Sequence, residues 1–163
     1  DIMEATNTLS KIGAIEMAQY ILKHYGPMSH LKLQKLLFYC DAYHLAYFDE
    51  ELISEQFEAW VHGPVCRVVF DSLKDKSLLY SDIQYSDIGV NEDYHFSLLS
   101  TIQQEFVNSI LLQLSPWTSL ELENATHCES PWIEARKGFA SGDKCHVAID
   151  KELTKQYYKK DLA

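Results

Sequence analysis

The sequence predicts a mainly α, compact single-domain helical fold of about six or seven helices with one or two short β-strands. Apolar residues recur every three or four positions over several long segments, which is the spacing of one buried helical face. Proline and glycine stand between these segments, where helices usually end or begin. The chain has 163 residues, 47% of them hydrophobic and 23% charged, which is typical of one globular domain over residues 1–163.

A first helix is expected over residues 8–25, where the apolar positions follow one helical face. Gly26 and Pro27 then end it, because proline cannot continue the helical hydrogen bonds and glycine suits the end of a helix.

A second helix is expected from Ser29, a candidate N-cap, to about Phe48. In its first half, Leu33 and Leu36 are predicted to face inward, whereas the outward side is predicted to carry Lys32, Lys35 and Asp41. Its second half is apolar or aromatic almost all round, which is typical of a helix surrounded by neighbours. We therefore expect it to be the central element.

The middle of the chain predicts less regular structure. Residues 57–61 alternate in polarity, which suits a short strand. Pro64 is expected at the first position of a third helix that extends to Leu73. Residues 75–96 mix aromatic residues with Asp, Ser, Gly and Asn, and we expect an irregular excursion or a small hairpin there.

Four further helices are predicted after this excursion. Ser97 is expected to cap one over residues 98–114, which carries a broad apolar stripe. The next two are expected to follow Pro116 and to begin at Pro131, and Asp150 is expected to cap the last one.

The composition also limits the classes of molecule that the chain is expected to bind. With 14 Lys and Arg against 24 Asp and Glu, the net charge is −10, so we expect no direct binding to nucleic acid. The acidity serves either solubility or the attraction of a basic protein. No apolar run is long enough to span a membrane, and residues 1–4 do not resemble a secretory signal. We therefore expect a cytoplasmic protein without membrane contact.

We expect neither a cofactor nor a metal site. The four cysteines form no CxxC pair, and the alternative is a site assembled in three dimensions from His127, Cys128, Cys145 and His146. His30, Gln34 and Asp41 lie near one helical stripe, which permits an acid–base interpretation. No serine or cysteine accompanies them in a catalytic motif, so the sequence predicts a binding protein and not an enzyme.

Three sequence blocks occur in one order: HLKLQKLLFY at 30–39, FEAWVHGPV at 57–65, and a segment from residue 120 that ends in THCESPW at 126–132. Together they resemble the SocA-like Panacea domain, a family of antitoxins and phage-associated GepA-like proteins. The resemblance covers about residues 12–160. Within it, the motif positions assigned a structural role are Leu33, Leu36, Trp60, Gly63, Pro64, Thr126, His127, Pro131 and Trp132.

The resemblance implies a bacterial or phage antitoxin, encoded beside its cognate protein toxin and neutralising it by direct binding. Alternatives are an adaptor that delivers the toxin to a AAA+ protease, as SocA does, an enzyme that reverses the toxin's modification, and a phage-encoded acidic inhibitor of a host protein. The resemblance implies neither a particular toxin nor an oligomeric state.

Two sets of residues are candidates for the contact surface. Five lie on the second predicted helix: His30, Lys32, Gln34, Lys35 and Asp41. Three lie in the irregular excursion, where adaptable aromatic loops often mediate binding: Tyr80, Tyr85 and Tyr94. For Lys32 and Lys35, pairing with a toxin's acidic residues and simple solvation are equally open. For Trp60 and Trp132 we favour core packing over an exposed binding role, and His127 is expected to end a helix.

Overall fold

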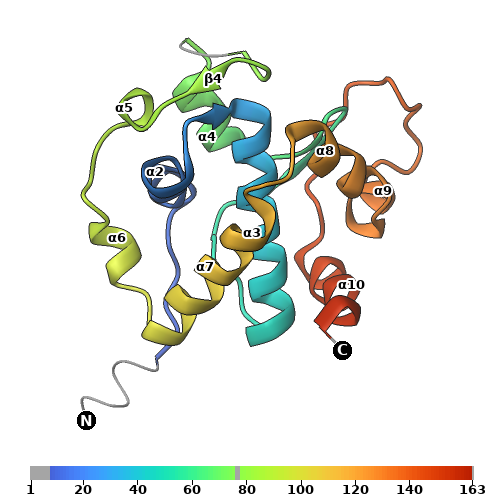
Figure 1. The fold of residues 1–163 in the computed structure, drawn as a ribbon. Coiled ribbons are helices and arrows are strands. Elements are labelled where there is room, and N and C mark those ends of the chain that lie inside the picture. Colours follow the sequence, from blue (N-terminus) through green and yellow to red (C-terminus); the bar gives the residue numbers. More distant parts are fainter. Residues whose placement is uncertain (1–7, 76–77, 163) are drawn as a thin grey trace.

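One long helix, α3 (His30–Phe48), lies at the centre of the computed structural model, which describes residues 8–75 and 78–162 (Figure 1). It contacts α2, α7, α8 and α10 and two of the short strands, so it is surrounded on nearly every side. This explains why its second half is apolar almost all round, and the prediction of a central helix is confirmed. The Ser29 hydroxyl accepts a hydrogen bond from the Lys32 backbone N–H, as expected of an N-cap.

The first helix described, α2 (Ala14–Tyr25), is shorter than predicted. Residue 12 is extended instead of helical, because Ile12 forms a parallel bridge with Ile53 and its N–H donates to the Leu52 carbonyl at 2.9 Å. The predicted start at residue 8 is therefore wrong. The predicted end is confirmed, since α2 stops immediately before Gly26.

Two small antiparallel sheets accompany the helices. In one, β1 (Met28–Ser29) pairs with β4 (Asp82–Ile83). In the other, β2 (Glu58–Trp60) and β3 (Gly63–Val65) form a tight hairpin. The strand predicted over 57–61 is thus confirmed.

The role predicted for Pro64 as the first residue of a helix is wrong. Pro64 lies in β3 opposite Ala59, and the helix, α4 (Arg67–Leu73), begins after Cys66. Strand pairing across the hairpin holds residues 63–65 extended, and proline is compatible with an extended edge position.

The irregular excursion is not a hairpin, because its strand, β4, pairs with the distant β1. Two single-turn helices follow along the outside of α2, α5 (Tyr85–Ile88) and α6 (Tyr94–Ser97) (Figure 1). The next helix, α7 (Thr101–Leu114), is capped by Ser100 and not by the predicted Ser97. Ser100 and Gln103 form a capping box, in which each side chain accepts from the other's backbone N–H.

The remaining helices are α8 (Ser119–His127), α9 (Ser130–Ala135) and α10 (Lys151–Leu162). Two predicted beginnings are confirmed: Pro131 lies in the first turn of α9, and the Asp150 carboxylate accepts from the Leu153 N–H at 2.9 Å. The cap of α8 is Thr118, two residues after Pro116.

The fold is mainly α, as predicted, with nine helices and two two-stranded sheets in the part of the chain described. The helices beyond the predicted six or seven are the single turns α5 and α6. None of the helices described has the length and apolar character needed to cross a membrane.

Candidate functional site: a partner-binding surface

The three sequence blocks meet around the β2–β3 hairpin, where polar side chains of α3 hold its backbone. Gln34 accepts a hydrogen bond from the Cys66 N–H at 2.8 Å and donates to the Cys66 carbonyl at 3.3 Å. The ammonium group of Lys35 donates to the Pro64 carbonyl at 2.6 Å. These bonds fix the hairpin against the central helix.

Position 63 requires glycine because Lys35 occupies the space where a side chain would lie. Its φ is +104°, which glycine tolerates best, and an added Cβ would lie 2.6 Å from Lys35 Cε and 2.9 Å from Thr126 Oγ1. The Lys35 side chain has no exposed surface, and this burial lowers its pKa to about 7 against the opposing effect of Glu123. One residue from each block therefore packs at a single point, the motif junction of Lys35, Gly63 and Thr126.

The motif tryptophans connect the hairpin to α9. Trp132 donates from Nε1 to the Trp60 carbonyl at 2.8 Å, and its ring stacks on His127 at 4.1 Å between centroids. Both tryptophans are half-buried, and Trp60 packs edge-on against Phe70. The two tryptophans thus pack as we favoured, and His127 is the last residue of α8.

Four of the five α3 residues predicted to face a partner are buried: His30, Gln34, Lys35 and Asp41. That prediction is wrong for these four, because a side chain enclosed by the fold has no surface to offer. The outward orientation predicted for Lys35 and Asp41 is wrong for the same reason. Neighbouring elements cover this side of α3, and its polar groups bind backbone or other side chains instead of solvent.

Asp41 and His30 illustrate these internal roles. Asp41 Oδ1 accepts from the backbone N–H groups of Leu52 and Ile53 at 2.9 and 3.0 Å, and Oδ2 lies 3.2 Å from Lys151 Nζ. Burial raises the Asp41 pKa, and Lys151 and the two N–H donors oppose the rise. The His30 ring lies 3.0 Å from the Gln34 amide, and burial with the nearby Lys35 lowers its pKa to about 4.

The fifth residue, Lys32, is half-buried. Its ammonium group donates to the Ser115 carbonyl at 2.5 Å, just beyond α7. Burial lowers its pKa. Pairing of Lys32 with an acidic group of a partner stays a prediction.

The three tyrosines of the excursion differ in exposure. Tyr80 and Tyr94 are 63% and 61% exposed, and the Tyr80 hydroxyl lies 3.0 Å from His62 Nδ1. Tyr85 is half-buried, and its hydroxyl accepts from the backbone N–H of Asn91 at 3.1 Å. Tyr85 thus orders its own loop, whereas the contact roles of Tyr80 and Tyr94 stay predictions.

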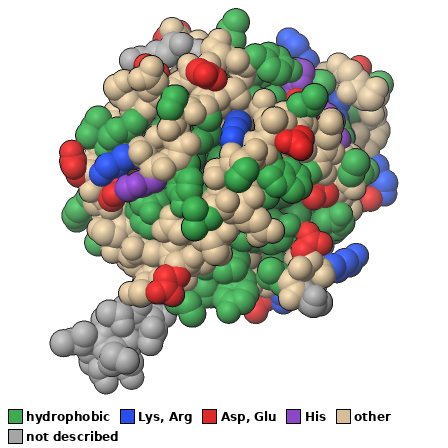
Figure 2. Space-filling model, in the orientation of Figure 1, with side chains coloured by type: hydrophobic (Ala, Val, Ile, Leu, Met, Phe, Trp, Pro, Cys, Tyr) green, Lys and Arg blue, Asp and Glu red, His purple; other side chains and the backbone are tan. Residues whose placement is uncertain are grey.

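Apolar side chains also lie exposed where α7 crosses the C-terminal half of α3. Ile102 is 44% exposed, and Tyr47 is 55% exposed and stacks on Phe106 at 4.8 Å between ring centroids. Ile102 and Phe106 are four residues apart and share one face of α7. We call Tyr47, Ile102 and Phe106 the apolar strip. Figure 2 shows patches of hydrophobic side chains on the face of the molecule that carries α7.

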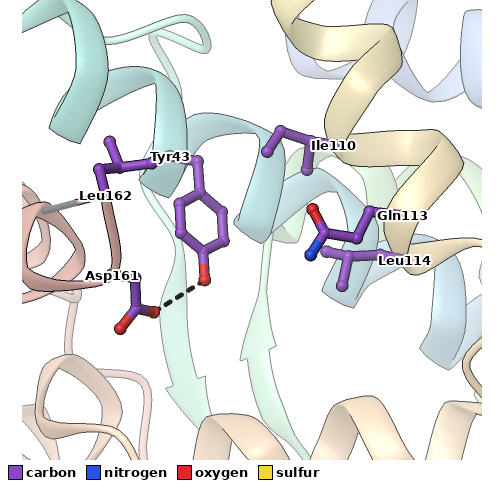
Figure 3. Close-up of a pocket in the computed structure, with 6 residues that line it drawn as sticks. All are labelled: Tyr43, Ile110, Gln113, Leu114, Asp161 and Leu162. Carbon is purple, nitrogen blue, oxygen red and sulfur yellow. Dashed lines mark hydrogen bonds between the residues drawn. The ribbon is translucent and has the colours of Figure 1, made fainter.

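A pocket of about 310 Å³ opens farther along the same face of α7, between α3, α7 and the end of α10. We call it the α10 pocket, and Figure 3 shows its lining: Tyr43, Ile110, Gln113, Leu114, Asp161 and Leu162. Tyr43 projects into the space between the two sides, and its hydroxyl donates to Asp161 Oδ2 at 2.9 Å (Figure 3). Burial, then this hydrogen bond to Asp161, raises the Tyr43 pKa, so the phenol stays protonated and donates to a carboxylate.

A second carboxylate lies among tyrosines beneath this pocket. Glu129 Oε1 accepts hydrogen bonds from the hydroxyls of Tyr39 and Tyr158, at 2.7 and 2.6 Å. Burial raises the Glu129 pKa, the hydrogen bonds from Tyr158 and Tyr39 oppose this rise, and Asp161 adds a smaller increase. Asp161 and Glu129 are therefore close enough to influence each other electrostatically.

The sequence predicts a broad apolar stripe over residues 98–114 but neither the strip nor the pocket, because periodicity does not tell which part of a stripe its neighbours leave exposed. The signal was the width of that stripe. Leu98 and Ile102 extend it beyond the face that α3 covers, and they are 58% and 44% exposed. Asp161 carried no signal, because its position beside Tyr43 depends on how α10 packs.

Of the four residues considered for zinc, Cys145 and His146 line a second hollow of about 330 Å³, whose lining is residues 60–62 and 144–146 and includes neither His127 nor Cys128. Cys145 is buried and Cys128 is exposed. Within residues 8–75 and 78–162, no group of three or more His, Cys, Asp or Glu side chains is arranged to hold a metal ion.

Comparison with known protein families gives a match over residues 33–133 to the family described as antitoxin SocA-like, Panacea domain. The match contains residues 33–39 of the first sequence block, the whole of the other two blocks, and the motif junction. Neither the curated proteins nor the solved structures gave a match to the chain.

Proposed function

The chain belongs to the SocA-like Panacea-domain family, and from this antitoxin membership we propose that it neutralises a cognate protein toxin by binding it directly. The toxin would be held in a stoichiometric complex on the face formed by the apolar strip and the α10 pocket. The observation that carries the proposal is the exposure of large apolar side chains along one side of α7.

The composition of this face suits a protein interface. Aromatic residues are enriched in interface cores, and Tyr47 and Phe106 already stack on each other at the surface. Ile102 and Leu114 are twelve positions apart on α7, which is a distance of about 18 Å along the helix. That length matches three turns of a helix from a partner, and anchors at helical spacing are a common way to fill such a surface.

The charge of the chain favours a basic toxin. The net charge is −10, and the pocket end of the face carries Asp161 with Glu129 beneath it. Complementary charge accelerates the encounter of two proteins and disfavours wrong partners. The toxin would thus be attracted by charge and retained by apolar contact. We expect the complex to form in the cytoplasm, where both proteins would be synthesised.

Our proposal is binding without catalysis. The polar residues that an acid–base interpretation requires, His30, Gln34 and Asp41, are buried. Gln34 and Asp41 are also hydrogen-bonded to backbone groups of the fold. A substrate would have to unfold this region to reach them.

The test is co-expression with the product of the neighbouring gene, with growth and co-purification measured. If the neighbour is toxic alone, restored growth with a stable complex of fixed stoichiometry supports neutralisation by binding. Restored growth with loss of the toxin indicates a protease adaptor. Restored growth with an intact but uncomplexed toxin indicates an enzyme, and both of the latter results contradict the proposal.

A further inference from the structure

The α10 pocket contains a carboxylate that the fold leaves available. Asp161 is exposed, and its Oδ2 accepts one hydrogen bond, from Tyr43. Among the ion pairs of the described residues, none includes Asp161. The nearby Lys159 pairs with Asp49, and Lys160 lies over the Tyr157 ring at 5.7 Å. The negative charge of Asp161 therefore faces the pocket without a cation beside it.

The walls around this carboxylate are mostly apolar. Ile110 and Leu114 line one side, Leu162 lies on the other, and Gln113 adds an amide oxygen as a further acceptor (Figure 3). At about 310 Å³ the pocket is at the lower end of the range for ligand sites, so it suits one side chain more than a large molecule. A mostly apolar pocket with one carboxylate in its lining matches a side chain with an aliphatic stem and a cationic head.

We propose that the α10 pocket binds an arginine side chain of the toxin, with the guanidinium on Asp161 and the stem against Ile110, Leu114 and Leu162. The toxin as the source of the arginine rests on the proposed function. Arginine fits better than lysine because its planar guanidinium has five donors, enough for Asp161 and Gln113 together. The same plane stacks on an aromatic ring, which Tyr43 provides.

A second copy of this chain is a poor source of the arginine. Its two arginines are Arg67 and Arg136. Arg67 pairs with Glu58 at 3.1 Å and covers the Trp60 ring, and Arg136 is buried and donates to the Ala59 carbonyl at 2.8 Å. Two chains of charge −10 also repel each other, which favours a different and basic protein.

The pocket can be tested without the toxin by NMR titration of the ¹⁵N-labelled chain. The probes are n-butylguanidinium and its uncharged isostere n-butylurea, added at constant ionic strength. We expect saturable shifts of the amides of Ile110, Gln113 and Leu114 with the guanidinium, and weaker or no binding of the urea. In Asp161→Asn the guanidinium should bind about two- to fivefold more weakly, because an exposed ion pair contributes up to about 1 kcal/mol, which is about fivefold in affinity.

Asp71→Asn is the matched control, since it removes one exposed aspartate on α4, outside the pocket. It should leave binding of the guanidinium unchanged. Equal binding of the two probes, unchanged binding in Asp161→Asn, or shifts confined to other surfaces would overturn the proposal.

Co-purification of Asp161→Asn with the neighbouring gene product separates this proposal from the proposed function. If the wild-type complex forms, Asp161→Asn co-purifies equally well and the guanidinium does not bind, the arginine pocket is refuted and the proposed function stands. If the guanidinium binds at the pocket but the wild-type chain forms no toxin complex, the toxin is refuted as the source of the arginine, together with the proposed function.

Discussion

Replacing the buried Lys35 by methionine should change how the stability of the protein depends on pH. Lys35 is fully enclosed at the motif junction, and its pKa falls from 10.5 to about 7 on folding. Methionine fills a similar volume without a titratable group. It also leaves the Pro64 carbonyl without its donor, which destabilises the variant at every pH.

The direction in which the free energy of unfolding changes with pH follows from the protons that each state binds. Between pH 7 and 10.5 the unfolded chain holds the Lys35 proton and the folded chain does not, so the free energy of unfolding rises with pH in this window. The slope approaches about 1.4 kcal/mol per pH unit. Below pH 7 both states are protonated and this slope disappears. From pH 7 to 9, the wild type should gain about 2 kcal/mol over Lys35→Met.

The assay is urea unfolding of both proteins at several values between pH 6 and 9.5, followed by circular dichroism. Leu37→Met is the matched control, because it places methionine at another buried position of α3 and removes no ionisable group. Its free energy of unfolding should stay parallel to that of the wild type. A constant difference between wild type and Lys35→Met from pH 7 to 9 would refute the lowered pKa of the buried Lys35.

Three further predictions concern the residues that hold the hairpin and α3 in place. Gly63→Ala should lower the free energy of unfolding by about 1–3 kcal/mol, because φ is +104° and the new Cβ would meet Lys35. An unchanged urea midpoint would contradict this. Asp41→Ala should lower the free energy of unfolding by about 3–5 kcal/mol, because it leaves two buried N–H groups and Lys151 without their acceptor. The reduction should be smaller in Asp41→Asn. Trp132→Phe should lose about 1 kcal/mol with its hydrogen bond to Trp60, a loss that the exposed Trp117→Phe should not show.

Helices whose apolar pattern continues over many residues were predictable from the sequence. The helix at 30–48 was placed within a residue, because its cap and its all-round apolar character agree with its central position. The end of α2 was equally clear, because Gly26 and Pro27 act locally. The start of α2 was not predictable, because the bridge between Ile12 and Ile53 joins residues far apart in sequence.

The candidate site was harder to predict than the fold. A polar residue on a helix predicts a solvent-facing side unless a neighbour covers it, and what covers Lys35 is the hairpin carrying Pro64. Conversely, an apolar residue such as Ile102 predicts burial, but α3 covers only part of the stripe on α7. Both errors have one cause, since helical periodicity identifies a face but not the partner that packs on it.

The most direct test of the central claim is co-purification of the neighbouring gene product with the wild type, Ile102→Asp and Leu120→Asp. Ile102 and Leu120 are both exposed apolar residues, and each is the second residue of a capped helix, where aspartate is well tolerated. They differ in that only Ile102 belongs to the apolar strip. We predict that Ile102→Asp abolishes the complex and that Leu120→Asp retains it at the wild-type ratio. Retention of the complex by Ile102→Asp, or its loss with Leu120→Asp alone, would contradict toxin binding at the apolar strip.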